Sequence, residues 1–378
     1  MLRLFNRFYT LCAVAAVTLL YSAWVLTSRH LGNSEPLVGG SFRTVSSFDR
    51  RLVVFGDSWS NVKTEERQGR VWTDWLCEMF SCHHENLAQT AKLISEGKLT
   101  GSVVDNADLE LVARPSPTKV PDFKSQLQLW LEAESKAVAD LSEEQIRSRQ
   151  DKTVFAVSFG LWDIWNLRTV DDRTAEGAVQ RRIATLMAQL NRLSESWGPG
   201  SNKLNVVLTQ TVDVTFLPGF AATAAGDDDV DYKRAVRILD VWNKKLRQAA
   251  KGWDRGTIYL FDTNAFVMDR IRDWQMYAAG IEEPNGLGTN RDPGWENVVD
   301  PCVVSEKSLQ TLLFKGMSQS RRQCKNPDKY LFCIADSKNF SLSDSRDEMH
   351  LGPSAHRLMA TEIYRGIDGV LLNVPDPK

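Results

Sequence analysis

The sequence predicts an α/β protein built on a doubly wound sheet of about five parallel strands, and two observations lead to this prediction. Short continuous apolar runs alternate with longer segments in which apolar residues recur at helical spacing. Such runs are typical of a parallel sheet that helices cover on both faces. The residues that follow four of the runs are Ser58, Gly160, Thr209 and Asp262. Parallel strands direct all four to one edge of the sheet, where such folds bind ligands.

The expected elements follow one another in order. The expected strands are Leu52–Phe55, a short second strand at Glu85–Ala88, Thr153–Phe159, Leu204–Leu208 and Thr257–Phe261. The expected helices, each with helical periodicity, are Val71–Phe80, Lys124–Val138, Ala175–Trp197, Tyr232–Gly252 and Ser354–Ile367. Pro353 suits the first turn of the last helix. Residues 282–346 are rich in Gly, Pro, Asn, Asp and Ser, and we expect a long loop excursion above the ligand-binding edge.

The chain has 378 residues, of which 43% are hydrophobic and 25% charged, as expected for a folded domain with a full core. Its net charge of −2 gives no reason to expect nucleic acid as a partner. The expected organisation is a cytoplasmic tail at 1–7, a transmembrane signal anchor at 8–27, a stem at 28–48 and a folded domain at 49–378.

The uncharged run at 8–27 is the basis for the predicted anchor. Twenty helical residues rise about 30 Å, the thickness of the hydrocarbon core of a bilayer. Arg3 and Arg7 precede the run and favour a cytoplasmic N-terminus, as in a type II membrane protein. A cleaved secretory signal is the alternative interpretation. Either interpretation places the folded domain in the secretory pathway (Golgi, endoplasmic reticulum or cell surface) or outside the cell.

The most informative motifs are Gly56-Asp57-Ser58, directly after an apolar strand, and Asp347-Glu-Met-His350, near the other end of the chain. A serine hydroxyl needs an imidazole to take its proton and a carboxylate to orient that imidazole. The available histidines are His30, His83, His84, His350 and His356. His350 is the expected base and Asp347 its orienting carboxylate. His356, on the predicted last helix, is the alternative base.

This arrangement resembles the SGNH, or GDSL-like, hydrolase superfamily, whose nucleophilic serine lies in an N-terminal Gly-Asp-Ser block and whose Asp-x-x-His block closes the triad. The resemblance covers roughly residues 49–370. It implies a flavodoxin-like sheet and a Ser58–His350–Asp347 triad that works without a metal or an organic cofactor. Asp57 is expected to hold the turn by hydrogen bonds.

The resemblance also implies three oxyanion donors, and two of them depart from the family pattern. The first donor is the backbone N–H of Ser58. The family's Asn-x-Ala-x-x-Gly block corresponds to residues 86–91, where Ala91 replaces the glycine. Its Gly-x-Asn-Asp block begins at Gly160, and Trp162 replaces the asparagine. An indole N–H donates one hydrogen bond. Asn166 is the alternative donor.

Two further features concern the ligand. Trp59, Trp162 and Trp165 are interpreted either as an aromatic wall for a sugar ring or acyl chain or as core packing, with core packing favoured for Trp165. The segment 324–332 resembles the Cys-x-x-Pro-x-x-Tyr-x-Phe run of plant and fungal GDSL-type esterases. Residues 333–346 are then an insertion beside the catalytic histidine.

The five cysteines after residue 27 suit an oxidising compartment. Cys77 and Cys82 are five residues apart near the end of a predicted helix, so a local disulfide is expected. The second expected disulfide is Cys302–Cys324, because Cys324 belongs to the family-like run. Cys333 then belongs to neither expected disulfide. A Cys302–Cys333 disulfide is the alternative to Cys302–Cys324. Asn339-Phe-Ser is a possible glycosylation sequon.

The expected function is therefore ester hydrolysis on a small-molecule or glycan ester. A carbohydrate O-acetyl ester is slightly favoured over a lipid ester by the resemblance, which is nearest to fungal carbohydrate esterases. The alternatives are a membrane-anchored polysaccharide O-acetyltransferase and a binding protein with a degenerate site. The acidic run Asp227-Asp228-Asp229 is expected to precede and cap a helix rather than bind a metal.

Overall fold

The structure of the protein is a computed structural model that covers the strands and helices of the predicted domain. The described residues are 44–45, 47–61, 70–89, 101–112, 120–197, 204–223, 228–281, 292–304, 322–333, 349–368 and 370. The predicted tail, the predicted anchor, most of the predicted stem and Asn339 lie outside them. Among the described residues, no helix has the length and apolar character needed to cross a membrane.

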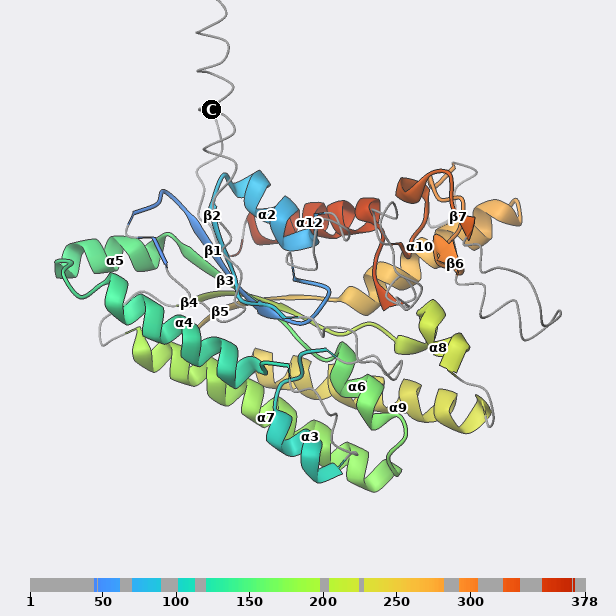
Figure 1. Cartoon of the computed structure of the whole chain (residues 1–378), viewed down its shortest axis with the longest axis horizontal. Helices are drawn as coiled ribbons and strands as arrows, with labels where there is room; N and C mark the ends of the chain where they lie inside the picture. Colours follow the sequence, from blue (N-terminus) through green and yellow to red (C-terminus); the bar gives the residue numbers. More distant parts are fainter. Residues whose placement is uncertain are drawn as a thin grey trace, which may run out of the picture. The chain divides into compact units, whose positions relative to one another are not determined.

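The described chain is built around a five-stranded sheet in which every strand runs parallel to its neighbours (Figure 1). The strands are β1 (Arg51–Gly56), β2 (His83–Asn86), β3 (Thr153–Ser158), β4 (Leu204–Thr209) and β5 (Gly256–Phe261). Their spatial order, β2-β1-β3-β4-β5, is that of flavodoxin-like sheets. The predicted α/β class with about five parallel strands is confirmed.

Helices cover both faces of this sheet, which explains why the strands are continuous apolar runs (Figure 1). One face carries α2 (Trp72–Phe80) and α12 (Pro353–Asp368), which pack against each other. The other face carries α4 (Phe123–Ala137), α7 (Asp172–Ser196) and α9 (Asp228–Lys251), with α7 in contact with both of its neighbours. Every residue of β1 and β3 is buried between the two layers.

Capping side chains explain where several helices begin. The side chains of Asp122, Ser142, Asp171 and Asp262 each accept a hydrogen bond from a backbone N–H in the first turn. This contact satisfies a donor that has no partner within the helix. The helix predicted to begin at Ala175 therefore begins three residues earlier, directly after Asp171.

Several elements were not predicted, because they are short or weakly amphipathic. They are α3 (Asn106–Val112), α5 (Glu143–Asp151), α6 (Leu161–Leu167), α8 (Pro218–Thr223), α10 (Thr263–Ala278), η2 (Val214–Phe216), η3 (Pro327–Lys329), β6 (Val303–Val304) and β7 (Arg322–Gln323). The last two form an antiparallel pair within the region predicted as a loop excursion. In α10 only three residues are buried, so its apolar spacing gave a weak signal.

Two further predicted boundaries were wrong by two residues or more. The second strand was expected at Glu85–Ala88 and lies at His83–Asn86, because Leu87 and Ala88 are buried beyond the strand end. There the backbone N–H of Ala88 donates a hydrogen bond to Oδ1 of Asn86, at 2.9 Å between N and O. The helix expected to begin near Tyr232 begins at Asp228, so Asp228 and Asp229 are helical rather than part of the preceding loop.

Both predicted disulfides are present. In the Cys77–Cys82 and Cys302–Cys324 pairs the Cα atoms are 5.0 Å apart, within the range that a disulfide needs. Ser81 follows α2 as its C-cap and has the left-handed conformation, with φ of 52°. The backbone reverses there, and the N–H of Cys82 donates to the carbonyl of Cys77. Cys333 is buried and takes part in neither disulfide.

Candidate active site

The carboxyl ends of the strands bring the predicted positions to one edge of the sheet, as expected. Ser58 follows β1, Gly160 follows β3, Thr209 ends β4 and Asp262 follows β5. Thr209 donates a hydrogen bond to the hydroxyl of Ser158, at 2.9 Å between the two Oγ atoms. Asp262 caps α10. The segments that begin at Ser58 and Gly160 carry the residues predicted for the site.

The turn that carries Ser58 is fixed by hydrogen bonds on both sides. The side-chain amide of Gln126 on α4 accepts from the N–H of Gly56 and donates to its carbonyl, each at 2.9 Å. Oδ1 of Asp57 accepts from the N–H of Trp59 at 3.0 Å. A Cβ at Gly56 would lie 2.9 Å from the carbonyl oxygen of Ser158, so glycine allows β1 and β3 to approach. The structural role predicted for Asp57 agrees with these contacts.

Burial changes the protonation of Asp57. Removal from water raises the pKa of its carboxyl to about 8, and the nearby negative charge of Asp163 adds to this rise, against the hydrogen bond from Trp59. The side chain of Asp57 is therefore largely neutral at pH 7. The neutral carboxyl therefore adds no negative charge next to Ser58.

The side chain of Trp162 contacts the Ser58 hydroxyl. Its indole Nε1 donates a hydrogen bond to Ser58 Oγ at 3.0 Å. The exposed fraction is 0% for Ser58 and 2% for Trp162, so this contact is shielded from solvent. The residue that replaces the family's asparagine thus directs an N–H at the predicted nucleophile.

Two glycines allow Trp162 to take this position. Gly160 has φ of 126°, in the region that favours glycine, and it is the N-cap of α6, which carries Trp162. Gly101 lies against the indole, where a Cβ would come within 2.1 Å of Nε1. The sequence did not identify Gly101, because nothing in the local pattern indicates which distant side chain will pack on a glycine.

A buried ion network holds α6 beneath this contact. Arg182 on α7 binds Asp163 and Asp108, at 3.0 Å and 2.9 Å. Oδ2 of Asp163 accepts from the N–H of Val104 at 3.3 Å and so ties α6 to the segment that contains Gly101. Burial raises the pKa of Asp163 to about 6, and Arg182 opposes that rise. These positioning residues were not predicted either, since each is one charged residue among many.

The alternative donor Asn166 and Asn86 of the 86–91 block have different surroundings. Nδ2 of Asn166 donates to the carbonyl of Trp162 at 2.6 Å, one turn back along the same helix. Nδ2 of Asn86 donates to the carbonyl of Ser60 at 2.6 Å and fixes the end of β2 against the Ser58 turn. Ala91 lies outside the described residues.

The segment of His350 is joined directly to the Ser58 turn. Trp59 Nε1 donates to the carbonyl of Met349 at 2.7 Å, and Met349 precedes His350 in the chain. His350 is 2% exposed. Its partner in the predicted triad, Asp347, lies outside the part of the chain that the structure describes.

His356 lies on α12, as predicted, and has the environment of a neutral core residue. It is fully buried, and neither ring nitrogen has a hydrogen-bond partner among the described residues. Burial lowers its pKa to about 3, and the positive charge that His350 can carry lowers it further, against the attraction of Asp74. A histidine with such a low pKa is a poor proton acceptor at neutral pH, which favours His350 as the base.

The three tryptophans near the site are all buried, which favours core packing over an exposed aromatic wall. The rings of Trp162 and Trp165 meet edge to face, with centroids 6.3 Å apart. Among the described residues, the side-chain group whose geometry suits a metal ion consists of Cys302, Cys324 and Cys333, and the first two are joined in a disulfide.

Comparison with protein-family models finds no family that matches the chain, and comparison with curated proteins finds no match. The resemblance to SGNH hydrolases therefore rests on the motifs of the sequence.

Proposed function

We propose that this protein is a serine ester hydrolase of the SGNH type. Ser58 is the nucleophile, His350 the general base and Asp347 the carboxylate that orients it. The observation that carries the proposal is the 2.7 Å hydrogen bond from Trp59 Nε1 to the carbonyl of Met349, which fixes the His350 segment to the Ser58 turn at the carboxyl edge of a parallel sheet. The 3.0 Å hydrogen bond from the Trp162 indole to Ser58 Oγ supports a role for that indole as an N–H donor at the reacting centre.

In this mechanism His350 takes the proton of Ser58 while Oγ attacks the ester carbonyl. The tetrahedral intermediate carries an oxyanion, which the backbone N–H of Ser58 and the indole N–H of Trp162 stabilise. Its collapse expels the alcohol, which takes the proton from His350 and leaves an acyl-enzyme. Water, deprotonated by His350, then attacks the acyl group. The bond to Ser58 Oγ breaks, the acid is released, and His350 returns its proton to Oγ. No metal or organic cofactor enters this scheme.

The proposed substrate class is a small acyl ester, with carbohydrate O-acetyl esters ahead of lipid esters. The resemblance to fungal carbohydrate esterases suggests the sugar. The burial of Ser58 under Trp162 supports a short acyl group, since a long chain would have to displace the indole. Hydrolysis rates for esters of increasing acyl length, and for acetylated glycans, test this choice.

The proposed setting is a type II membrane protein of the secretory pathway with the catalytic domain outside the cytoplasm. The support is the uncharged run at 8–27 after two arginines, and the two disulfides agree with an oxidising compartment. Carbonate extraction of the full-length protein tests the anchor. Release of a shortened chain into the supernatant would mean a cleaved signal instead.

The central test is turnover of p-nitrophenyl acetate by the wild-type protein and the Ser58→Ala variant. We expect the variant to lose the turnover, and equal rates would remove Ser58 from the mechanism. Labelling by a fluorophosphonate probe is the second readout, because the probe reacts with an activated serine.

A second candidate is a binding protein with a degenerate site. The observation that favours it is again the indole of Trp162, which covers a serine with no exposed surface. Binding of an acetylated sugar without any labelling of Ser58 would support this candidate over the hydrolase.

A further inference from the structure

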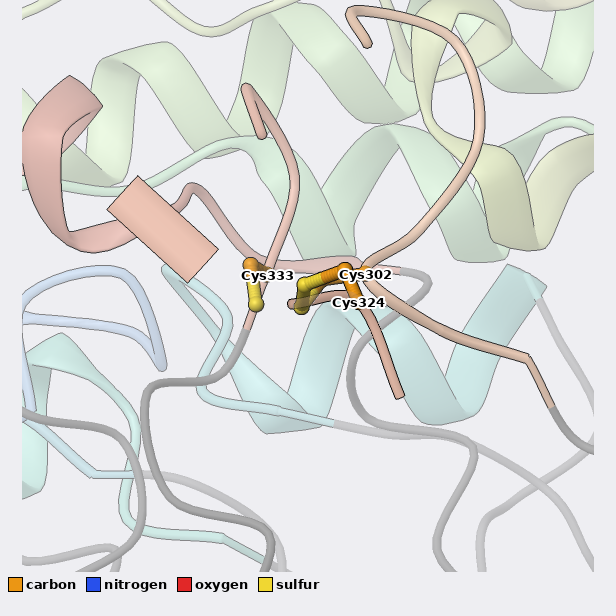
Figure 2. A group of neighbouring side chains, drawn as sticks. All are labelled: Cys302, Cys324 and Cys333. Atoms are coloured by element: carbon orange, nitrogen blue, oxygen red, sulfur yellow. A yellow bond between two sulfur atoms is a disulfide. The ribbon is translucent and has the colours of Figure 1, made fainter. Parts of the chain in front are cut away.

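Three cysteines from separate segments of the chain meet at one point (Figure 2). The Sγ atoms of Cys302, Cys324 and Cys333 all lie within 4.8 Å of one another. Cys302 and Cys324 form a disulfide, and Cys333 is buried beside it without taking part in a disulfide. A third sulfur this near to a disulfide is a candidate for exchange, because exchange proceeds by attack of a thiolate on a disulfide sulfur.

The backbone makes Cys302 the central member of the group. The N–H of Cys324 donates to the carbonyl of Cys302 at 2.9 Å, and the N–H of Cys302 donates to the carbonyl of Phe332 at 3.1 Å. Cys302 is therefore held between the segment that carries Cys324 and the segment that carries Cys333. The Sγ atoms of both neighbours lie within 4.8 Å of Sγ of Cys302.

We propose that Cys333 exchanges with Cys324, so that the chain holds two interconvertible disulfides, Cys302–Cys324 and Cys302–Cys333. The Cys333 thiol loses its proton, and its thiolate attacks Sγ of Cys302. The Cys302–Cys324 bond breaks as the Cys302–Cys333 bond forms, and Cys324 leaves as a thiolate that takes up a proton. One disulfide and one thiol stand on each side of the step, so no oxidant or reductant is consumed.

The exchange transfers the crosslink to the segment that borders His350. The N–H of Cys333 donates to the carbonyl of His350 at 3.2 Å, and Phe332 forms a β-bridge with Leu351. In the alternative disulfide this segment is fixed covalently to Cys302, whereas Cys324 becomes the thiol. Cys324 is partly exposed and the other two are buried, so the thiol moves to a position that a reagent reaches more readily.

The test is non-reducing peptide mapping of the full-length protein. Samples held at pH 8 without reductant are quenched in acid, denatured and alkylated before digestion. We expect both linked peptides, Cys302–Cys324 and Cys302–Cys333, with the alkylated thiol on Cys333 in the first and on Cys324 in the second. A wild-type protein that gives only the Cys302–Cys324 peptide after prolonged incubation overturns the proposal.

Two variants sharpen the result. In Cys324→Ser the remaining pair is expected to form Cys302–Cys333, and a folded variant in which both cysteines are alkylated also overturns the proposal. In the matched control, Cys333→Ser, only Cys302–Cys324 is expected. None of these readouts depends on esterase activity, so the exchange and the proposed function can fail separately.

Discussion

Trp59 donates its indole N–H to the carbonyl of Met349 at 2.7 Å, across a separation of 290 residues. This single bond joins the turn after β1 to the residue before His350. It connects the two motifs on which the proposed triad depends, although neither motif contains a signal for it.

Replacement of Trp59 by phenylalanine is expected to lower kcat by about 10- to 100-fold, because a small displacement of the base is costly to catalysis. The buried Met349 carbonyl also loses its donor, which costs about 1–3 kcal/mol of stability. Trp75→Phe is the matched control, since its indole N–H has no partner among the described residues. Steady-state kinetics and denaturant unfolding measure the two effects. Equal behaviour of the variants would contradict the assignment.

Trp162→Phe is expected to reduce kcat by about 10²–10³ with little change in KM, because it removes the proposed oxyanion donor and keeps an aromatic ring. Trp162→Asn, which places an amide where the family has one, should retain kcat. Comparison of the two variants separates the effect of the N–H donor from the effect of side-chain size. If Trp162→Phe kept full kcat while folded, the indole N–H would have no part in the reaction.

Gly101→Ala should displace the indole of Trp162, because the new methyl group would lie 2.1 Å from Nε1. Overpacking of this kind costs about 1–3 kcal/mol, and kcat should fall with it. Gly177→Ala is the control, since the nearest atom to its Cβ is the end of the flexible Arg181 side chain at 3.4 Å. Alanine within α7 should leave activity unchanged and raise stability by up to about 1 kcal/mol. Thermal unfolding and steady-state kinetics of both variants measure the two effects, and equal stability and kcat for the two variants would contradict the prediction.

The buried His356 should make the fold sensitive to acid. Its pKa is about 3 in the folded chain and 6.5 ordinarily. Above pH 6.5 both states are neutral and His356 adds no pH dependence. Between pH 6.5 and 3 the unfolded chain binds a proton that the folded chain does not, so stability falls as pH falls, by up to about 1.4 kcal/mol per pH unit.

The variant His356→Phe keeps a ring of similar size and cannot titrate. The free energy of unfolding, measured from pH 7.5 to pH 5, should decline less steeply for the variant than for the wild type. Identical slopes would show that His356 is solvated or paired when the protein is folded.

The sequence by itself determined the α/β class and the approximate positions of the strands. It indicated the Cys77–Cys82 disulfide, whereas the choice of Cys302–Cys324 over Cys302–Cys333 rested on the family resemblance. Continuous apolar runs such as Leu52–Phe55 are local signals, and a parallel sheet buried on both faces is the arrangement that uses them. The Cys77–Cys82 pair was predicted because its two members lie near one helix end. Their Cα separation of 5.0 Å depends on the left-handed conformation of Ser81, which the sequence did not indicate.

Only the tertiary structure decided how the candidate site is assembled. The Trp162 contact with Ser58, the glycine that makes room for it and the Trp59 bond to Met349 all join residues far apart in the chain. The exact end of β2 also depends on the tertiary structure. Leu87 and Ala88 are as apolar as strand residues, but they lie outside the strand. The physical reason is that periodicity reports which face of an element is buried, whereas the partner that a buried side chain meets depends on how separate elements pack.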